Sequence, residues 1–149
     1  MEKNVKETRI TARLFSAIVV LFVLIALQPV YTQQLRNSSN ATIGAIESNG
    51  VIRDKSNRQV GRIESDGVIR NSSNAQIGKL QQDGVVRDKN NAQIGRIQAD
   101  GVVRDKTNTQ IGRIQPDGTV RNSSNAQIGS AKGVRQEWAA IAFFFFNDL

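Results

Sequence analysis

One short pattern recurs at every seventeenth position from Arg36 to Gly129, and this strict period limits what the chain can fold into. A repeat of this length is too short for a two-helix unit or a four-stranded propeller blade, but it suits two short strands and two turns. An arginine, an asparagine and a glycine are kept in all six copies: Arg36, Arg53, Arg70, Arg87, Arg104 and Arg121; Asn40, Asn57, Asn74, Asn91, Asn108 and Asn125; Gly44, Gly61, Gly78, Gly95, Gly112 and Gly129.

A second glycine marks one of the two turns. It follows Asn or Asp in five copies, at Gly50, Gly67, Gly84, Gly101 and Gly118. In the last copy Pro116 precedes Asp117 and Gly118. Proline fixes φ at about −65°, which suits position i+1 of a type I turn and excludes a type I′ turn. We therefore predict type I turns in which the glycine adopts left-handed φ and forms a bulge.

The other turn begins with Asn or Asp and ends with Asn, as in residues 71–74. The first side chain of such a turn accepts a hydrogen bond from the backbone two residues later. Asparagine tolerates left-handed φ better than most other non-glycine residues. Backbone geometry thus explains the recurring turn residues Asn57, Asn74, Asn91 and Asn108 without any further role.

The apolar positions define two strands in each unit. In one strand, the residue before the repeated arginine is β-branched and apolar in the five copies from Arg53 to Arg121, as at Ile52. The position before that admits Thr119 and is predicted to be half-exposed. In the other strand, apolar residues such as Val60 and Ile63 flank the glycine three positions apart, and a regular pleat would send them to opposite faces. A bulge or bend at Gly61 is predicted to turn both inward.

A single unit of this kind cannot fold alone. It buries about three apolar side chains at roughly 1.5–3 kcal/mol each, whereas backbone ordering costs about 1–2 kcal/mol per residue. Each hairpin therefore needs its neighbours to complete a core. We predict one all-β domain over residues 33–149, built from five to six 17-residue β-hairpin repeats at about 36–135, arranged around a pseudo-fivefold axis or as a closed stack.

The last segment, residues 136–149, is much more apolar than the repeats. It contains the only Trp of the chain and four of its six Phe. We predict that it forms a strand or short helix that fills the core, with Trp138, Phe143, Phe144, Phe145 and Phe146 as the core plug. The alternatives are an exposed partner-binding tail and a membrane-contacting end.

The segment 1–32 has the layout of a secretory signal peptide. Basic residues precede an apolar run from Leu14 to Leu27, and Val30 and Thr32 suit positions −3 and −1 of a cleavage site. A retained anchor is the alternative, but a spanning helix usually needs about 20 apolar residues. No cysteine is present for lipidation. We expect a secreted, periplasmic or cell-envelope protein that meets the membrane only through this peptide.

The composition offers little for catalysis or metal binding. The chain has neither Cys nor His, which removes thiolates and the commonest general base. The carboxylates recur once per turn and are explained by turn geometry. Lys55, Lys89 and Lys106 lie inside the turns that faintly resemble calcium loops, where a cation opposes metal binding. We therefore expect no enzyme activity, no metal and no cofactor.

The repeated arginines are the one candidate binding site. If rotation relates the units, Arg53, Arg70, Arg87, Arg104 and Arg121 form a ring or stripe that binds sulfate, phosphate or uronic acid. The favoured alternative pairs each arginine with an Asp or Glu of a neighbouring unit. Expected partners are therefore a cell-envelope glycan or another envelope protein.

These features favour a structural or binding protein. A lectin-like carbohydrate- or anion-binding module is the alternative, although sugars usually stack on exposed Trp or Tyr, which this chain lacks in number. An enzyme is the third possibility. Nucleic acid is not an expected partner, because the charges of residues 33–149 alternate in sign along an exported chain.

Five x-[Asp/Asn]-Gly-x-[Val/Ile]-Arg hairpins alternate with Asn-x-x-[Ile/Val]-Gly ahead of the aromatic tail. This arrangement, over residues 35–149, resembles the bacterial 5-fold β-flower proteins. The resemblance implies five hairpin petals about a pseudo-fivefold axis, and it implies no activity and no functional residues. MORN-type repeats are the nearest alternative, but they are longer and rich in Tyr and Trp.

Overall fold

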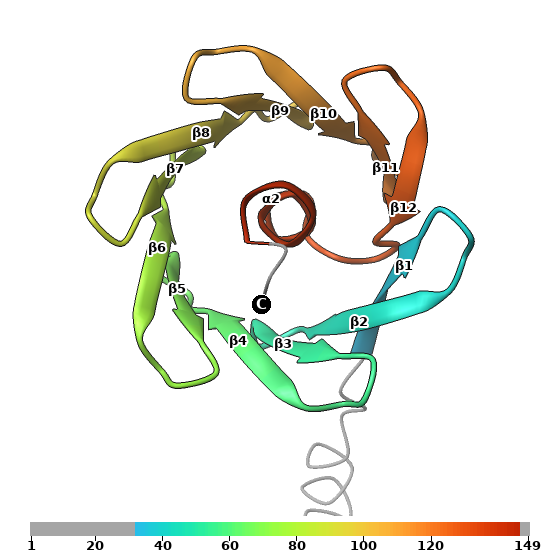
Figure 1. Ribbon diagram of the computed structural model, residues 1–149, viewed down its shortest axis with the longest axis horizontal. Helices are drawn as coiled ribbons and strands as arrows, with labels where there is room; N and C mark the ends of the chain where they lie inside the picture. Colours follow the sequence, from blue (N-terminus) through green and yellow to red (C-terminus); the bar gives the residue numbers. More distant parts are fainter. Residues whose placement is uncertain (1–31, 147–149) are drawn as a thin grey trace, which may run out of the picture. The chain divides into compact units, whose positions relative to one another are not determined.

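The computed structural model describes residues 32–146, which form a closed barrel of antiparallel strands around a C-terminal helix (Figure 1). The proposed signal peptide lies outside the described residues, apart from Thr32. The barrel has twelve strands: β1 (Thr32–Asn37), β2 (Thr42–Glu47), β3 (Val51–Asp54), β4 (Gln59–Ile63), β5 (Val68–Asn71), β6 (Gln76–Leu80), β7 (Val85–Asp88), β8 (Gln93–Ile97), β9 (Val102–Asp105), β10 (Gln110–Ile114), β11 (Thr119–Asn122) and β12 (Gln127–Ser130).

Each strand pairs with the next one along the chain, and the barrel closes where β12 pairs with β1. Six hairpins end in the asparagine turns, and the five [Asp/Asn]-Gly turns connect one hairpin to the next. The sixth connection is the non-covalent seam, at which Arg36 opposes Ser130 and Asn37 opposes Gly129. The predicted all-β fold of hairpin repeats is thus confirmed. The barrel has six hairpins, and the five complete [Asp/Asn]-Gly turns of the sequence are the connections between them.

Both predicted turns have the expected backbone. In the second unit the N–H of Gly67 donates to the carbonyl of Glu64 at 3.0 Å, the φ of Gly67 is +85°, and the N–H of Glu64 donates to the carbonyl of Val68. The asparagine turn repeats this geometry, with a φ of +64° at Asn57. Left-handed φ recurs at all six repeated asparagines of the pattern, so each turn is a type I turn followed by a bulge.

A bulge also explains the inward pair of apolar residues in each first strand. In β4, Gly61 opposes Ile52 and Gln59 opposes Arg53, so Val60 is the extra residue. This bulge lies beside the glycine and lets Val60 and Ile63 both pack toward the core, as predicted. The same register shift recurs in the equivalent strand pairs.

One burial prediction was wrong. Val51, Val68, Val85 and Val102 occupy the position that we expected to be half-exposed, and all four are buried. Thr119 is partly exposed at this position. Val51 lies directly opposite Arg62 on β4, and the other three valines oppose Lys79, Arg96 and Arg113. Directly opposed residues of antiparallel strands share one face of the sheet, so each of these valines lies on the same face as a basic residue.

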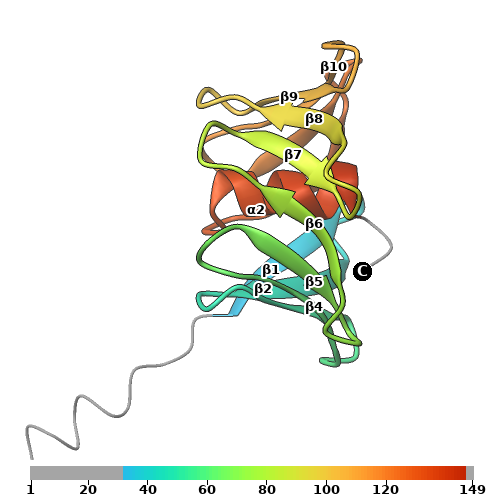
Figure 2. The ribbon, with the colours of Figure 1, turned by 90° about the vertical axis from the view of Figure 1, so that its left-hand side faces the viewer.

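The C-terminal segment occupies the centre of the barrel (Figure 2). The helix α2 (Gln136–Ala140) continues into a π-helical turn, η1 (Ile141–Phe145), which ends with a hydrogen bond of 3.0 Å from the N–H of Phe146 to the carbonyl of Ile141. Ala139, Ala140 and Ile141 are fully buried, and Trp138 is almost so. Within residues 32–146, no helix has the length and apolar character needed to cross a membrane.

Candidate functional site

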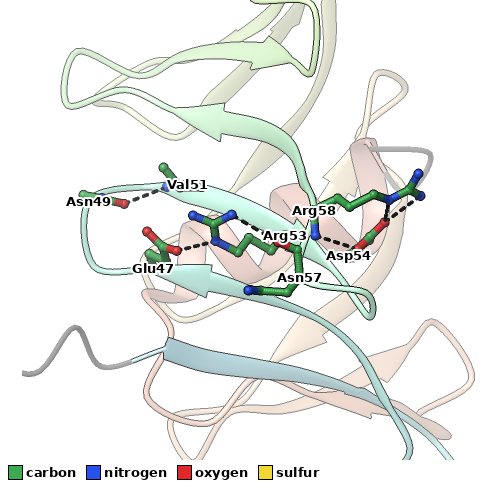
Figure 3. A network of polar contacts seen from close by, with 7 residues as sticks. All are labelled: Glu47, Asn49, Val51, Arg53, Asp54, Asn57 and Arg58. Carbon is green, nitrogen blue, oxygen red and sulfur yellow. Dashed lines mark hydrogen bonds and ion pairs between the residues drawn. The ribbon is translucent and has the colours of Figure 1, made fainter.

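The repeated arginine of each unit connects the two turns at the ends of its strand (Figure 3). In the first unit, the Nε of Arg53 on β3 donates to the carboxylate of Glu47 at the end of β2. One terminal nitrogen of Arg53 donates to the backbone carbonyl of Asn57, 3.1 Å away. The carbonyl belongs to the residue with left-handed φ, so the arginine holds the strained turn in place.

The same two contacts recur at Arg70, Arg87, Arg104 and Arg121, which we call, together with Arg53, the staple arginines. Their acceptor lies six residues earlier, at the end of the preceding hairpin and across the connecting [Asp/Asn]-Gly turn. It is Glu64 for Arg70, but it is an uncharged glutamine for the last three staple arginines. Those three guanidinium groups are therefore bonded but not neutralised.

A second set of basic residues, which the sequence interpretation missed, faces the staple arginines. These residues lie on β4, β6, β8 and β10, and each is directly opposite a staple arginine of the next strand. The opposed pairs are Arg62 and Arg70, Lys79 and Arg87, Arg96 and Arg104, and Arg113 and Arg121. We call these four, Arg62, Lys79, Arg96 and Arg113, the facing cations. Each follows the repeated glycine directly, so the recurring Gly-[Arg/Lys]-[Ile/Leu] was the signal that would have identified them.

The facing cations are exposed and only weakly paired. Arg96 lies 3.7 Å from Asp83 and Arg113 lies 3.4 Å from Asp100, and about half of each of these arginine side chains is accessible. Such exposed ion pairs contribute little energy. Together the facing cations and their four opposing staple arginines form one basic arc over the eight consecutive strands β4 to β11. The sequence predicted a single ring or stripe of repeated arginines. The structure instead shows two rows of basic residues that extend over part of the barrel.

The carboxylates of the asparagine turns act as turn acceptors. The backbone N–H of Arg58 and the guanidinium of Arg58 donate to Asp54, and these hydrogen bonds lower the pKa of its carboxyl (Figure 3). In Asp105 the hydroxyl of Thr107 and the N–H of Thr109 lower the pKa in the same way. Among residues 32–146, no group of three or more Asp and Glu side chains is arranged to hold a metal ion.

The interior of the barrel is filled by the chain itself. Phe143 to Phe146 pack against the apolar core formed by the strands. Depressions are found at its edges, among them one of about 110 Å³ beside Trp138 and Arg135, one of about 150 Å³ beside Gly44 and Ala142, and one of about 240 Å³ beside Ile97 and Arg135. The guanidinium carbon of Arg135 lies 4.8 Å from the centre of the Trp138 ring, so these two residues hold each other at the rim.

Comparisons with known proteins agree with this architecture. A family model described as 5-fold beta-flower protein matches residues 32–147. Searches of curated proteins and of solved structures found no match to the chain. The match begins with the first strand of the barrel and includes the whole central helix. The chain therefore belongs to the 5-fold beta-flower protein family.

Proposed function

We propose that this chain is an exported, non-catalytic β-repeat protein of the bacterial cell envelope that acts through its outer surface. One observation supports an outer surface above all: the barrel interior, where a ligand would otherwise bind, is occupied by the chain's own helix and phenylalanines. The polar groups that are available to bind a ligand lie on the outer face of the barrel and in the turns.

The surface favours recognition by charge over recognition by aromatic stacking. Among residues 32–146, Ile43 is the one large hydrophobic residue that is exposed, and the Trp138 side chain is buried. Sugar rings that stack on aromatic side chains would find no platform there. The exposed basic arc, by contrast, offers guanidinium groups that bind carboxylates and phosphates in pairs of hydrogen bonds.

Export rests on the sequence of residues 1–32, and it can be tested directly. We expect the protein isolated from cells to begin at Gln33 and to fractionate outside the cytoplasm. Leu24→Arg breaks the apolar run and is expected to leave an unprocessed chain inside the cell. Gln82→Arg adds the same charge to an exposed turn of the barrel and serves as the control. Normal export of the Leu24→Arg variant, or a native chain that still begins at Met1 in the cytoplasm, would contradict the proposal.

A further inference from the structure

We propose that the basic arc binds a flexible linear polyanion, which lies along the outside of strands β4 to β11. This inference deepens the proposed function, on which it rests for the place where the polymer would be met. The arc contains the facing cations Arg62, Lys79, Arg96 and Arg113 and the staple arginines that oppose them, Arg70, Arg87, Arg104 and Arg121.

Opposed cations are a feature that folding alone disfavours. Like charges directly opposite on neighbouring strands destabilise a sheet, because their side chains lie about 4.5–5.5 Å apart at Cβ. The staple arginines are explained by their contacts with both turns, but the facing cations make no comparable contact. Four like-charged pairs in succession therefore indicate a surface selected for something other than stability.

The chain itself shows that the fold does not need the facing cations. The equivalent position, after the repeated glycine, is Ala45 in the first hairpin and Ser130 in the last. Ala45 opposes Arg53, and Ser130 opposes Arg36 across the seam, so both barrel positions accept a small neutral residue. The cations are confined to the four hairpins between these two, which makes the arc a continuous surface that ends on either side of the seam.

The geometry of the arc selects the kind of polymer. Within a pair the Cβ atoms of opposed residues are about 5 Å apart, and a diagonal neighbour in the next pair is at about 7–8 Å. The eight strands that carry the arc curve around the central helix α2 (Figure 1). A flexible chain with closely spaced anionic groups can follow this curve and meet several pairs at once. A flat lipid surface contacts only part of a convex arc, and duplex DNA, with a persistence length of about 50 nm, is too stiff to wrap it.

Two sources share the required chemistry, namely the carboxylates of an acidic polysaccharide and the phosphates of a phosphate polymer. Single-stranded nucleic acid is disfavoured, because its binding proteins use exposed aromatic side chains for base stacking. The outer face of the barrel formed by residues 32–146 presents no exposed aromatic side chain. The unneutralised guanidinium groups of Arg87, Arg104 and Arg121 suit either anion, because each keeps one terminal nitrogen outside its two turn contacts.

The experiment measures binding of the purified protein to polygalacturonate and to inorganic polyphosphate, with neutral dextran and anionic phospholipid vesicles as further probes. The test variant is Arg62→Ser, Lys79→Ser, Arg96→Ser and Arg113→Ser combined, which copies the residue found at position 130. The matched control is Lys55→Ser, Lys89→Ser, Lys106→Ser and Lys132→Ser combined, which removes the same charge from exposed positions outside the arc. Thermal melting establishes that both variants are folded.

At about 50 mM salt we expect the test variant to bind at least about tenfold more weakly and the control to bind within about twofold of the parent, with affinity falling steeply as salt rises. Binding of polygalacturonate alone, polyphosphate alone or both supports the proposal and identifies the anion. Ser130→Lys, which lengthens the arc, is expected to raise the affinity, and it provides the test if the fourfold variant does not fold.

The proposal is overturned if neither polymer binds, if dextran or vesicles bind and the two polyanions do not, or if the control loses as much affinity as the test variant. These outcomes are independent of the export experiment. If the protein is exported but does not bind polyanions, only the arc proposal is contradicted. If it binds polyanions but stays in the cytoplasm, only the proposed location is contradicted.

Discussion

The ring of Phe146 covers the backbone of Gly78, so a Cβ atom added at Gly78 would lie 2.5 Å from the ring carbon Cζ. The same relationship joins Phe145 to Gly95, Phe144 to Gly112 and Phe143 to Gly129. Each step of one residue along the tail therefore corresponds to a step of one whole repeat back along the barrel. The π-helical turn suits this match, because its wider winding turns less per residue than the about 100° of an α-helix and so approaches the angle between hairpins.

Gly112→Ala tests the contact between the Phe144 ring and the backbone of Gly112. The new methyl group would collide with the Phe144 ring and with the carbonyl of Arg121, and Phe144 cannot withdraw because Phe143 and Phe145 occupy the neighbouring seats. We expect a loss of about 1–3 kcal/mol in the free energy of unfolding, measured by urea denaturation.

Gly44→Ala is the matched control. A Cβ atom at Gly44 meets the carbonyl of Arg53 at 2.5 Å, which reproduces the backbone conflict, but no phenylalanine lies within reach. The difference between the two variants isolates the contribution of the aromatic ring. If Gly44→Ala destabilises the barrel as much as Gly112→Ala, the phenylalanine seat has no energetic role.

Removal of residues 138–149 tests the central helix as the core element. Trp138 and the fully buried Ile141 each contribute roughly 1.5–3 kcal/mol of burial. With the partly buried phenylalanines added, the loss is comparable to the about 5–15 kcal/mol that stabilises a typical domain. We expect no cooperative thermal transition by circular dichroism. A chain ending at Phe146 keeps every contact described for the barrel and should melt cooperatively. A cooperative transition in the chain that lacks residues 138–149 would show that the strands form a stable barrel without the helix.

Arg87→Lys tests the staple. The Nε of Arg87 donates to Gln81 at 3.0 Å and a terminal nitrogen donates to the carbonyl of Asn91 at 2.8 Å. A lysine ammonium cannot reach both acceptors in this geometry, so we expect a loss of about 1 kcal/mol. Lys79→Ser, directly opposite, removes a charge without removing a staple and should change stability by less than about 0.5 kcal/mol. Equal losses in the two variants would contradict the assignment of different roles.

Acid should weaken the asparagine turns that begin with aspartate. Hydrogen bonds from Arg58 and from Thr107 lower the pKa of Asp54 and of Asp105 in the folded state. A carboxyl with a lowered folded-state pKa stabilises the fold above its unfolded pKa, and this contribution disappears as the pH falls below about 4.

The combined variant Asp54→Asn and Asp105→Asn should therefore remain folded but lose less stability than the parent between pH 6 and pH 2. Asparagine already serves at the equivalent positions Asn71 and Asn122, where its side-chain oxygen accepts the same backbone N–H groups. Denaturation curves at several pH values give the comparison. Parallel pH dependence in the two proteins would mean that these carboxyls do not report on folding.

The sequence alone determined the turns, the strands and the apolar character of the tail. Pro116 fixes φ, whereas Gly118 and Asn74 permit the left-handed φ that their turns require. These preferences are local, so their consequences can be predicted without knowledge of the rest of the chain. The shortness of the repeat also required neighbouring units to complete one core, since a single hairpin buries too little.

Only the tertiary structure decided how these pieces meet. Closure between β12 and β1 and the packing of each tail phenylalanine against a glycine both bring together segments that are far apart in the sequence. The strands of the seam are far apart in the sequence, and no local φ preference specifies that they pair. The opposition of Arg96 to Arg104, by contrast, follows from the tight turn between β8 and β9, because turn type fixes the register of a hairpin. The burial of Val85, which lies opposite Arg96, was not foreseen either, because burial depends on the surroundings of a residue in the closed barrel and not on its place in the repeat alone.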